Sequence, residues 1–168
     1  MSHEGADPSS AVVQAFHSGD HDHRACREAA LSAAEARCRE RGMRFTRLRR
    51  RVLELIWAGH QPVKAYDLLE TLRQERQGAA PPTVYRTLDF LLQERLIHRV
   101  ESLNAYVGCS RPGHRHPVQL MVCRDCHAVA EMADPQIIEN LRRSSEQLGF
   151  RMDTATIELE GTCPACTT

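Results

Sequence analysis

Apolar residues recur at intervals of three and four in three segments of the N-terminal half, which predicts three amphipathic helices. The first begins at Thr46, a residue type that caps helices, and ends at Gly59. The second spans about residues 64–76, and the third begins at Pro81, where a proline costs no helical hydrogen bond. The positions expected to face the core are Leu48, Val52, Leu55 and Ile56 in the first helix, Leu68, Leu69 and Leu72 in the second, and Val84, Leu88, Leu91 and Leu92 in the third.

The same half carries signals for one earlier helix and for a hairpin. Residues 26–41 favour helix, and Gly42 supplies the stop. After the third amphipathic segment, LIHRVES and AYVGC have the composition of short strands, and a turn around Leu103 and Asn104 joins them. Short helices followed by a hairpin are the layout of a winged helix, which we predict for this half.

The C-terminal half has a different pattern, with strand-like segments around a single helix. Residues 118–122 and 128–132 favour strands, and an Asp-Pro pair at 134–135 predicts a helix that ends at Gly149. Residues 150–160 then form a half-buried strand in this prediction, with Ala155, Ile157 and Leu159 on one face. Because so small an α+β domain has few apolar residues for a core of its own, we expect it to pair with a second copy.

Residues 1–23 are rich in Ser, Gly, His and Asp and show no periodicity, which predicts a disordered tail. His17, His21 and His23 lie close to Cys26 in the sequence. This group either catches a metal ion loosely or does no more than extend into solvent, as His-rich tails usually do. We interpret it as a passive tail.

Length and cysteine usage narrow the class of protein. The chain has 168 residues, enough for one or two compact domains, and no apolar run approaches the roughly 18 residues of a membrane helix. The apolar segment of a signal peptide is also missing. Seven cysteines without an export signal favour metal ligands over disulfides, so we expect a cytoplasmic protein without membrane contact.

The net charge is zero over the whole chain but is unevenly distributed. Residues 24–105 carry 16 basic and 10 acidic groups, a net charge of +6, against −4 for residues 1–23 and −2 for residues 106–168. Within the first block, residues 37–51 hold eight arginines and a single acid, Glu40. This run is either a solvated helix face or a surface that binds a polyanion such as DNA.

Two CxxC pairs, Cys123 with Cys126 and Cys163 with Cys166, are separated by 36 residues. A CxxC turn directs two thiolates at one ion, so two such turns complete a closed tetrahedral zinc site. Two unrelated pairs of buried or redox cysteines are the weaker interpretation, because a thioredoxin-type motif needs only one CxxC. Since protein sulfur fills all four positions, we predict a structural zinc rather than a catalytic one.

A second group of potential ligands consists of His98, Cys109, His116 and Glu131, with His114 nearby. The first two fall in the predicted hairpin and the others in the C-terminal half, so a shared ion would tie the two halves together. Spacing alone leaves this site open, because a single histidine is more often a surface residue or a hydrogen-bonded core residue than a ligand.

Five segments resemble the ferric uptake regulator superfamily, and particularly its zinc uptake regulator branch: KAYDLL, PPTVYRTLDFLLQ, HRVES, CRDC and CPAC. The match covers about residues 31–166. It implies an α+β chain with a winged-helix domain at 24–106 and a zinc-binding dimerisation domain at 107–168, preceded by the tail at 1–23. It places a structural zinc on the four cysteines and a regulatory zinc on His98, Cys109, His116 and Glu131.

The resemblance also implies a function. With two zinc ions per chain, a homodimer of this family binds an approximately palindromic double-stranded DNA operator and represses zinc-uptake genes; it is not an enzyme. Iron-type members carry an HHDH cluster before the first CxxC, whereas this chain has HRHPVQLMVC, with His116 seven residues ahead of Cys123. The thiolate of Cys109 also makes the regulatory set softer than Fe(II) or Mn(II) prefers. Both departures favour zinc, and His114 remains an alternative to His116.

The resemblance points to DNA contacts as well. Arg86 lies in the first turns of the implied recognition helix, where an arginine pairs with guanine or contacts a phosphate. Tyr85 beside it either packs in the core or contacts a base, and Tyr66 begins the preceding helix. The candidates for phosphate contacts are Lys64, Thr83, Arg44, Arg47 and Arg49.

Three alternatives stay open at this point. One is an iron- or peroxide-responsive member of the same superfamily. A second is a zinc hydrolase, which needs three protein ligands, an open water position and a base, for which Glu131 is the candidate. The third is a zinc-stapled protein-interaction module, which has no use for the basic block or the recognition helix.

Overall fold

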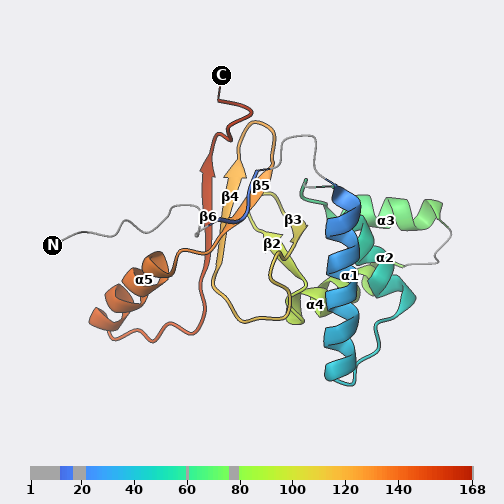
Figure 1. Cartoon of the computed structure of the whole chain (residues 1–168), viewed down its shortest axis with the longest axis horizontal. Coiled ribbons are helices and arrows are strands. Elements are labelled where there is room, and N and C mark those ends of the chain that lie inside the picture. The colour runs from blue at the N-terminus through green and yellow to red at the C-terminus, as the bar shows by residue number, and fades with distance from the viewer. Residues whose placement is uncertain (1–11, 17–21, 60, 76–79, 168) are drawn as a thin grey trace.

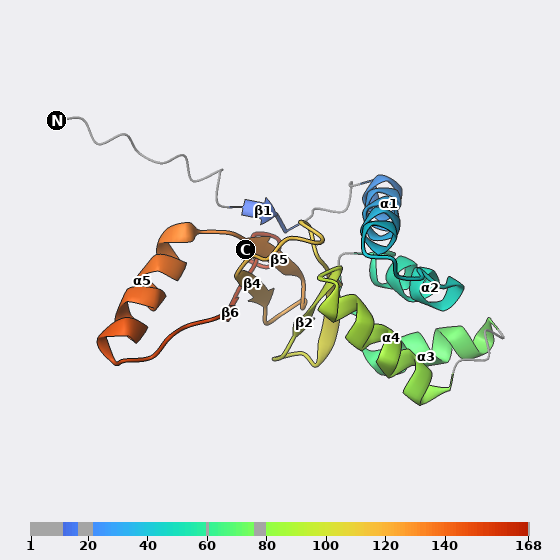
Figure 2. The ribbon, with the colours of Figure 1, turned by 90° about the horizontal axis from the view of Figure 1, so that it is seen from below.

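A computed structural model describes residues 12–16, 22–59, 61–75 and 80–167. Four helices gather at one end, a sheet and a fifth helix lie at the other, and a hairpin stands between them (Figures 1 and 2). The strands form a two-stranded sheet, β2-β3, and a four-stranded sheet in the order β1-β5-β4-β6. No helix in the described part of the chain combines the length and apolar composition needed to cross a bilayer.

The helical end consists of α1 (His23–Glu40), α2 (Arg47–Ile56), α3 (Ala65–Gln74) and α4 (Pro81–Gln93). The Thr46 hydroxyl accepts a hydrogen bond from the backbone N–H of Arg49, which confirms the predicted start of α2. The predicted inward leucines of α3 are all buried. In α2 the buried side is broader than predicted: Leu53 is fully buried, and Leu48 and Leu55 only partly.

The predicted hairpin is present as β2 (Ile97–Val100) and β3 (Ala105–Gly108). Ile97 pairs with Gly108, and Asn104 adopts a positive φ of 46° in the connecting turn, a conformation that asparagine tolerates well. β3 therefore continues past the domain boundary that the sequence suggested between residues 106 and 107. An isolated bridge from Val63 to Tyr106 ties this hairpin to the segment before α3.

The C-terminal sheet contains β4 (Val118–Cys123), β5 (Val129–Met132) and β6 (Thr156–Gly161), and α5 (Pro135–Gln147) connects β5 to β6. The Asp134 carboxylate accepts from the N–H of Gln136, as the Asp-Pro signal predicted. β6 runs parallel to β4 at the sheet edge. Its face is less covered than predicted, because Leu159 is 45% exposed in the single chain.

The prediction of a disordered segment through residue 23 is wrong in two places. Val12–Gln14 form β1, which pairs antiparallel with β5 and places Gln14 opposite Glu131. The three-residue strand lies in a short apolar run, AVVQAF, which is too short to show a period of two. Its pairing depends on the edge of β5, which is distant in the sequence. α1 also begins earlier than expected, at His23, since Asp22 caps it. His17 and His21 lie outside the described residues.

Two apolar clusters organise the chain. The larger one fills the helical end and includes Ile97 and Tyr106 of the hairpin. The smaller one joins Val100 of β2 to Leu120, Val122 and Val129 of the C-terminal sheet. The hairpin thus packs on the helices on one side and on the sheet on the other, which brings β2, β3 and β5 together.

Candidate metal centres

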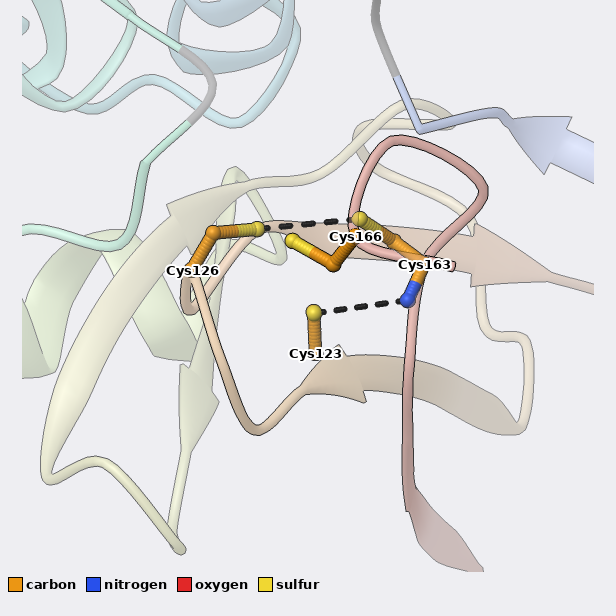
Figure 3. A group of neighbouring side chains, drawn as sticks. All are labelled: Cys123, Cys126, Cys163 and Cys166. Carbon is orange, nitrogen blue, oxygen red and sulfur yellow. Dashed lines mark hydrogen bonds between the residues drawn. The ribbon is translucent and has the colours of Figure 1, made fainter. Parts of the chain in front are cut away.

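The four cysteines of the two CxxC pairs meet at one end of the C-terminal sheet (Figure 3). Cys123 ends β4, and its parallel pairing with Gly161 carries the chain after β6 to the same place. The four sulfur atoms all lie within 4.8 Å of one another. Cys123 and Cys163 are buried, and Cys126 and Cys166 partly so. The parallel register of β4 and β6 therefore builds the group that the spacing predicted.

The environment of these thiols is suited to a cation. Backbone N–H groups of Cys126 and then Cys163 lower the pKa of Cys123 to about 6, and the Cys163 N–H lies 3.3 Å from its sulfur. Hydrogen bonding to Cys126 and then Cys163 raises the pKa of Cys166 to about 12. The protein alone thus favours the thiolate of Cys123 and disfavours that of Cys166. A bound dication stabilises all four together, so the group fits a closed tetrahedral zinc site.

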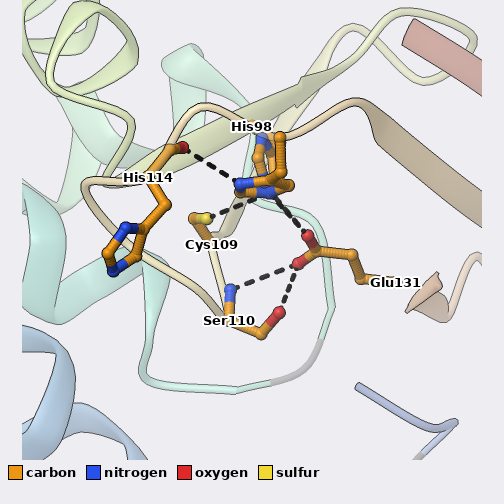
Figure 4. Close-up of polar contacts among 6 residues, drawn as sticks. His98, Cys109, Ser110, His114 and Glu131 are labelled. Carbon is orange, nitrogen blue, oxygen red and sulfur yellow. Dashed lines mark hydrogen bonds and ion pairs between the residues drawn. The ribbon is translucent and has the colours of Figure 1, made fainter. Parts of the chain in front are cut away.

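The second predicted ligand group also converges, between the hairpin and the C-terminal sheet (Figure 4). His98 lies on β2, Cys109 directly after β3, His116 in the following loop and Glu131 on β5. One ligand atom from each residue lies within 4.8 Å of those from the others. His116 Nε2 is 3.0 Å from Glu131 Oε1 and 3.7 Å from Cys109 Sγ, and His98 Nε2 is 3.4 Å from the same carboxylate oxygen.

Without a bound ion, burial of this group is unfavourable, because its polar atoms lack enough partners. His98, Cys109 and Glu131 are buried, and His98 Nε2 has no hydrogen bond of acceptable geometry among the described residues. Burial, followed by the charge of Glu131, raises the pKa of Cys109 to about 12. Burial alone would raise the pKa of Glu131 too, but the 3.4 Å approach and charge of His98 and hydrogen bonds from Ser110 lower it to about 2. An ionised carboxylate, an unsatisfied imidazole nitrogen and a thiol facing one point fit a metal cation.

Of the two candidate histidines, His116 converges on the other three residues and His114 does not. The His114 ring points away from the group in Figure 4, and its side chain is exposed. Its backbone carbonyl lies 3.1 Å from His116 Nδ1. Because a carbonyl only accepts, Nδ1 of His116 carries a proton and Nε2 faces Cys109 and Glu131.

Ser110 is a member of this centre that the sequence did not reveal. Its hydroxyl and its backbone N–H donate to Glu131 Oε2 at 2.6 and 3.2 Å. These bonds leave Oε1 directed at the two histidines and so orient the carboxylate. The only signal for this role in the sequence is the position of Ser110 next to Cys109, which is too weak to single out a serine.

The residues predicted to contact DNA belong to the helical end, and all but Arg49 are exposed. Thr83, Tyr85 and Arg86 are exposed in the first turns of α4, so Tyr85 is not a core residue. Tyr66 on α3 is 69% exposed. Arg49 differs from the others, because its guanidinium stacks 3.4 Å over the ring of Phe90 and also donates to the Arg44 carbonyl. The remaining exposed members of this set are Lys64, Arg44 and Arg47.

Known proteins with similar sequences were found across most of the chain. A zinc uptake regulation protein of Escherichia coli (strain K12) is 38% identical over 139 residues, which cover 81% of this chain and 80% of that protein. One from Mycobacterium tuberculosis (strain ATCC 25618 / H37Rv) is 30% identical over 128 residues, covering 74% and 95%.

Solved structures agree in fold. A zinc uptake regulator complexed with zinc and DNA is 37% identical, with a TM-score of 0.78 over 83% of this chain and 94% of that one. Holo XcZur is 40% identical, with a TM-score of 0.75 over 82% and 96%. The profile described as the ferric uptake regulator family matches residues 40–160. The chain belongs to the ferric uptake regulator family.

Proposed function

We propose that this chain is a zinc-responsive transcriptional repressor that binds operator DNA as a homodimer and represses zinc-uptake genes. It acts in the cytoplasm, and each chain holds two zinc ions. Cys123, Cys126, Cys163 and Cys166 hold a structural ion, and His98, Cys109, His116 and Glu131 hold a regulatory one. The similarity to zinc uptake regulation proteins and to a zinc uptake regulator complexed with zinc and DNA supports this proposal.

The observation that carries the proposal is that the second ligand set comes from two parts of the chain. His98 and Cys109 belong to the hairpin that packs on the helical end, whereas Glu131 belongs to the C-terminal sheet. A bound zinc ion supplies a positive charge that satisfies ligands from both parts at once. The bound ligands therefore hold the recognition helix, α4, at one position relative to the C-terminal sheet. Metal binding and DNA binding then favour the same conformer.

The donor set favours zinc over iron. Cys109 contributes sulfur beside two imidazole nitrogens and a carboxylate, a combination typical of zinc rather than of Fe(II) or Mn(II). The same set argues against a hydrolase. Glu131 lies within the ligand group rather than beside it, and four protein ligands leave no position for a catalytic water. Members of this family regulate transcription and are not enzymes.

Homodimer formation is supported by apolar side chains that the single chain leaves exposed. They lie on β6 and on or just after α5, on the other side of the hairpin from the four N-terminal helices (Figure 1). Two chains joined there present two copies of α4, which suits an approximately palindromic operator. These side chains are Leu141, Leu148, Phe150 and Leu159.

A metal titration of DNA binding tests the proposal. Operator fragments selected from random DNA by the zinc-loaded protein are bound in buffers of fixed free Zn²⁺, Fe²⁺ or Mn²⁺. We expect zinc to produce dimer binding at the lowest free concentration. Binding that is independent of metal, or that responds to Fe²⁺ at a lower free concentration than to Zn²⁺, would overturn it.

A further inference from the structure

A carboxylate two strands across the sheet from Glu131 also joins the hairpin to the C-terminal sheet. Glu158 lies on β6, paired in register with Leu120 of β4. Its two carboxylate oxygens accept hydrogen bonds from the backbone N–H groups of Glu101 and Ser102, at 2.5 and 3.0 Å. These N–H groups belong to the turn between β2 and β3, so one side chain satisfies two donors that the hairpin itself leaves unpaired.

The contact has the properties of a charge-assisted latch. Burial on its own would raise the pKa of Glu158, but the hydrogen bonds from Ser102 and Glu101 lower it below its usual value. The carboxylate is therefore ionised at neutral pH, and hydrogen bonds to an ionised acceptor are the stronger class. Glu158 is partly buried, so solvent does not fully screen them. Leu103 of the same turn packs on the apolar cluster that joins the hairpin to the sheet.

We propose that Glu158 is a positioning residue that holds the turn of the hairpin on the dimerisation sheet and thereby reduces the zinc needed for operator binding. The inference rests on the proposed function. The latch and the regulatory ligands act at different places on the same two bodies: Glu158 at the turn, and Glu131 near the other end of β2 and β3. Both contacts favour the same position of the hairpin on the sheet. Without the Glu158 contact, zinc binding must therefore supply more of the free energy that holds the hairpin there.

The test compares Glu158→Gln with Glu160→Gln, a matched control on the same strand whose side chain is exposed. The amide introduced by Glu158→Gln keeps the shape of the side chain but loses the charge, and it turns an N–H₂ group toward two N–H donors. We expect the free zinc for half-maximal operator binding to rise about threefold to tenfold, the effect of losing one or two such bonds. The four-cysteine zinc should stay bound, and Glu160→Gln should match the wild type.

A second readout does not depend on DNA. In the zinc-loaded wild type, amide hydrogen exchange at Glu101 and Ser102 should be protected, and Glu158→Gln should lose that protection selectively. Glu158→Asp, which keeps the charge but shortens the side chain, should give a smaller shift in both readouts. If Glu158→Gln matches Glu160→Gln in zinc requirement and in amide hydrogen exchange, the proposed role of Glu158 is wrong, although zinc-dependent operator binding stands. If the wild type itself shows no zinc-dependent binding but the exchange difference appears, the proposed function fails and the structural latch remains.

Discussion

At the scale of single residues, the geometry separates side chains that build the centres from those that would contact a partner. Arg86 is exposed near the start of α4 and makes no ion pair among the described residues, so its guanidinium is available for a base or phosphate. Arg49 lies on the same surface but is stacked on Phe90. Both residues are arginines, but the Arg49 guanidinium already stacks on Phe90, whereas that of Arg86 makes no ion pair among the described residues. Arg86 is therefore the stronger candidate for DNA recognition.

Replacement of Arg86 by alanine should weaken operator binding by about 1 to 3 kcal/mol, the range for a bidentate base contact. Fold, dimer and zinc content should not change, because the side chain contacts solvent. Fluorescence anisotropy with the selected operator measures the loss. Arg124→Ala removes the same charge from an exposed position beside the cysteine group and is the control. Wild-type affinity in Arg86→Ala would exclude the assigned role.

Cys109→Ser should open the regulatory site without unfolding the chain. The buried thiol lies where the hairpin ends, and a serine hydroxyl is a poorer zinc ligand of nearly the same size. We expect a folded dimer with one tightly bound zinc per chain that needs far more free zinc to bind its operator. His98→Ala should behave in the same way. Bound-zinc counts and zinc-dependent mobility shifts check both variants, and dissociation of Cys109→Ser into monomers would contradict the regulatory role.

At the scale of elements, close packing between α2 and β3 fixes the hairpin on the helical end. A Cβ atom added at Gly108 would lie 2.0 Å from Cε2 of Trp57, which is itself buried. Gly108→Ala should therefore lower the free energy of unfolding by about 1 to 3 kcal/mol through overpacking. Trp57 is the only tryptophan, so its fluorescence follows unfolding directly. Gly161→Ala, with open space around the added atom, should change stability little; equal stability of both variants would contradict the packing.

The cysteine group joins β4 to the segment after β6, and its loss should affect a whole domain. Cys123→Ser removes a ligand from a closed site whose binding energy is folding energy, on the order of 10 kcal/mol for a structural zinc. We expect loss of the dimer and of much C-terminal structure, measured by sedimentation and circular dichroism. If Cys123→Ser stays dimeric while Cys109→Ser dissociates, the roles of the two centres are reversed.

Elements with strong local signals were predictable from the sequence, and elements specified by distant partners were not. Thr46 and the Asp-Pro pair at 134–135 mark helix starts through local capping, and the structure confirms both. β1 was missed because its pairing depends on the edge of β5. The close approach of Gly108 to Trp57 was invisible for the same reason, since 51 positions separate the two residues.

At the scale of the whole molecule, the two centres differ in how far sequence reasoning reaches. Each CxxC pair indicates a metal ligand pair through local spacing alone, so the four-cysteine site was predictable from the sequence. The proposed regulatory ligands span residues 98–131. Their spacing grouped them but left the site open, and the family resemblance was needed to predict a zinc site there; in the structure their ligand atoms lie within 4.8 Å of one another. Ser110 and Glu158 were not predicted at all, because orienting and latching roles depend on contacts between the hairpin and the sheet.

The central claim is that metal binding and DNA binding favour one conformer of the dimer, and reciprocity tests it most directly. Zinc affinity of the regulatory site is measured by chelator competition with and without saturating operator, and operator affinity with and without saturating zinc. The two ratios must be equal, and each tenfold factor corresponds to about 1.4 kcal/mol of coupling. The account predicts equal ratios well above one in the wild type and ratios near one in Cys109→Ser. Zinc affinity that operator DNA leaves unchanged in the wild type would contradict it.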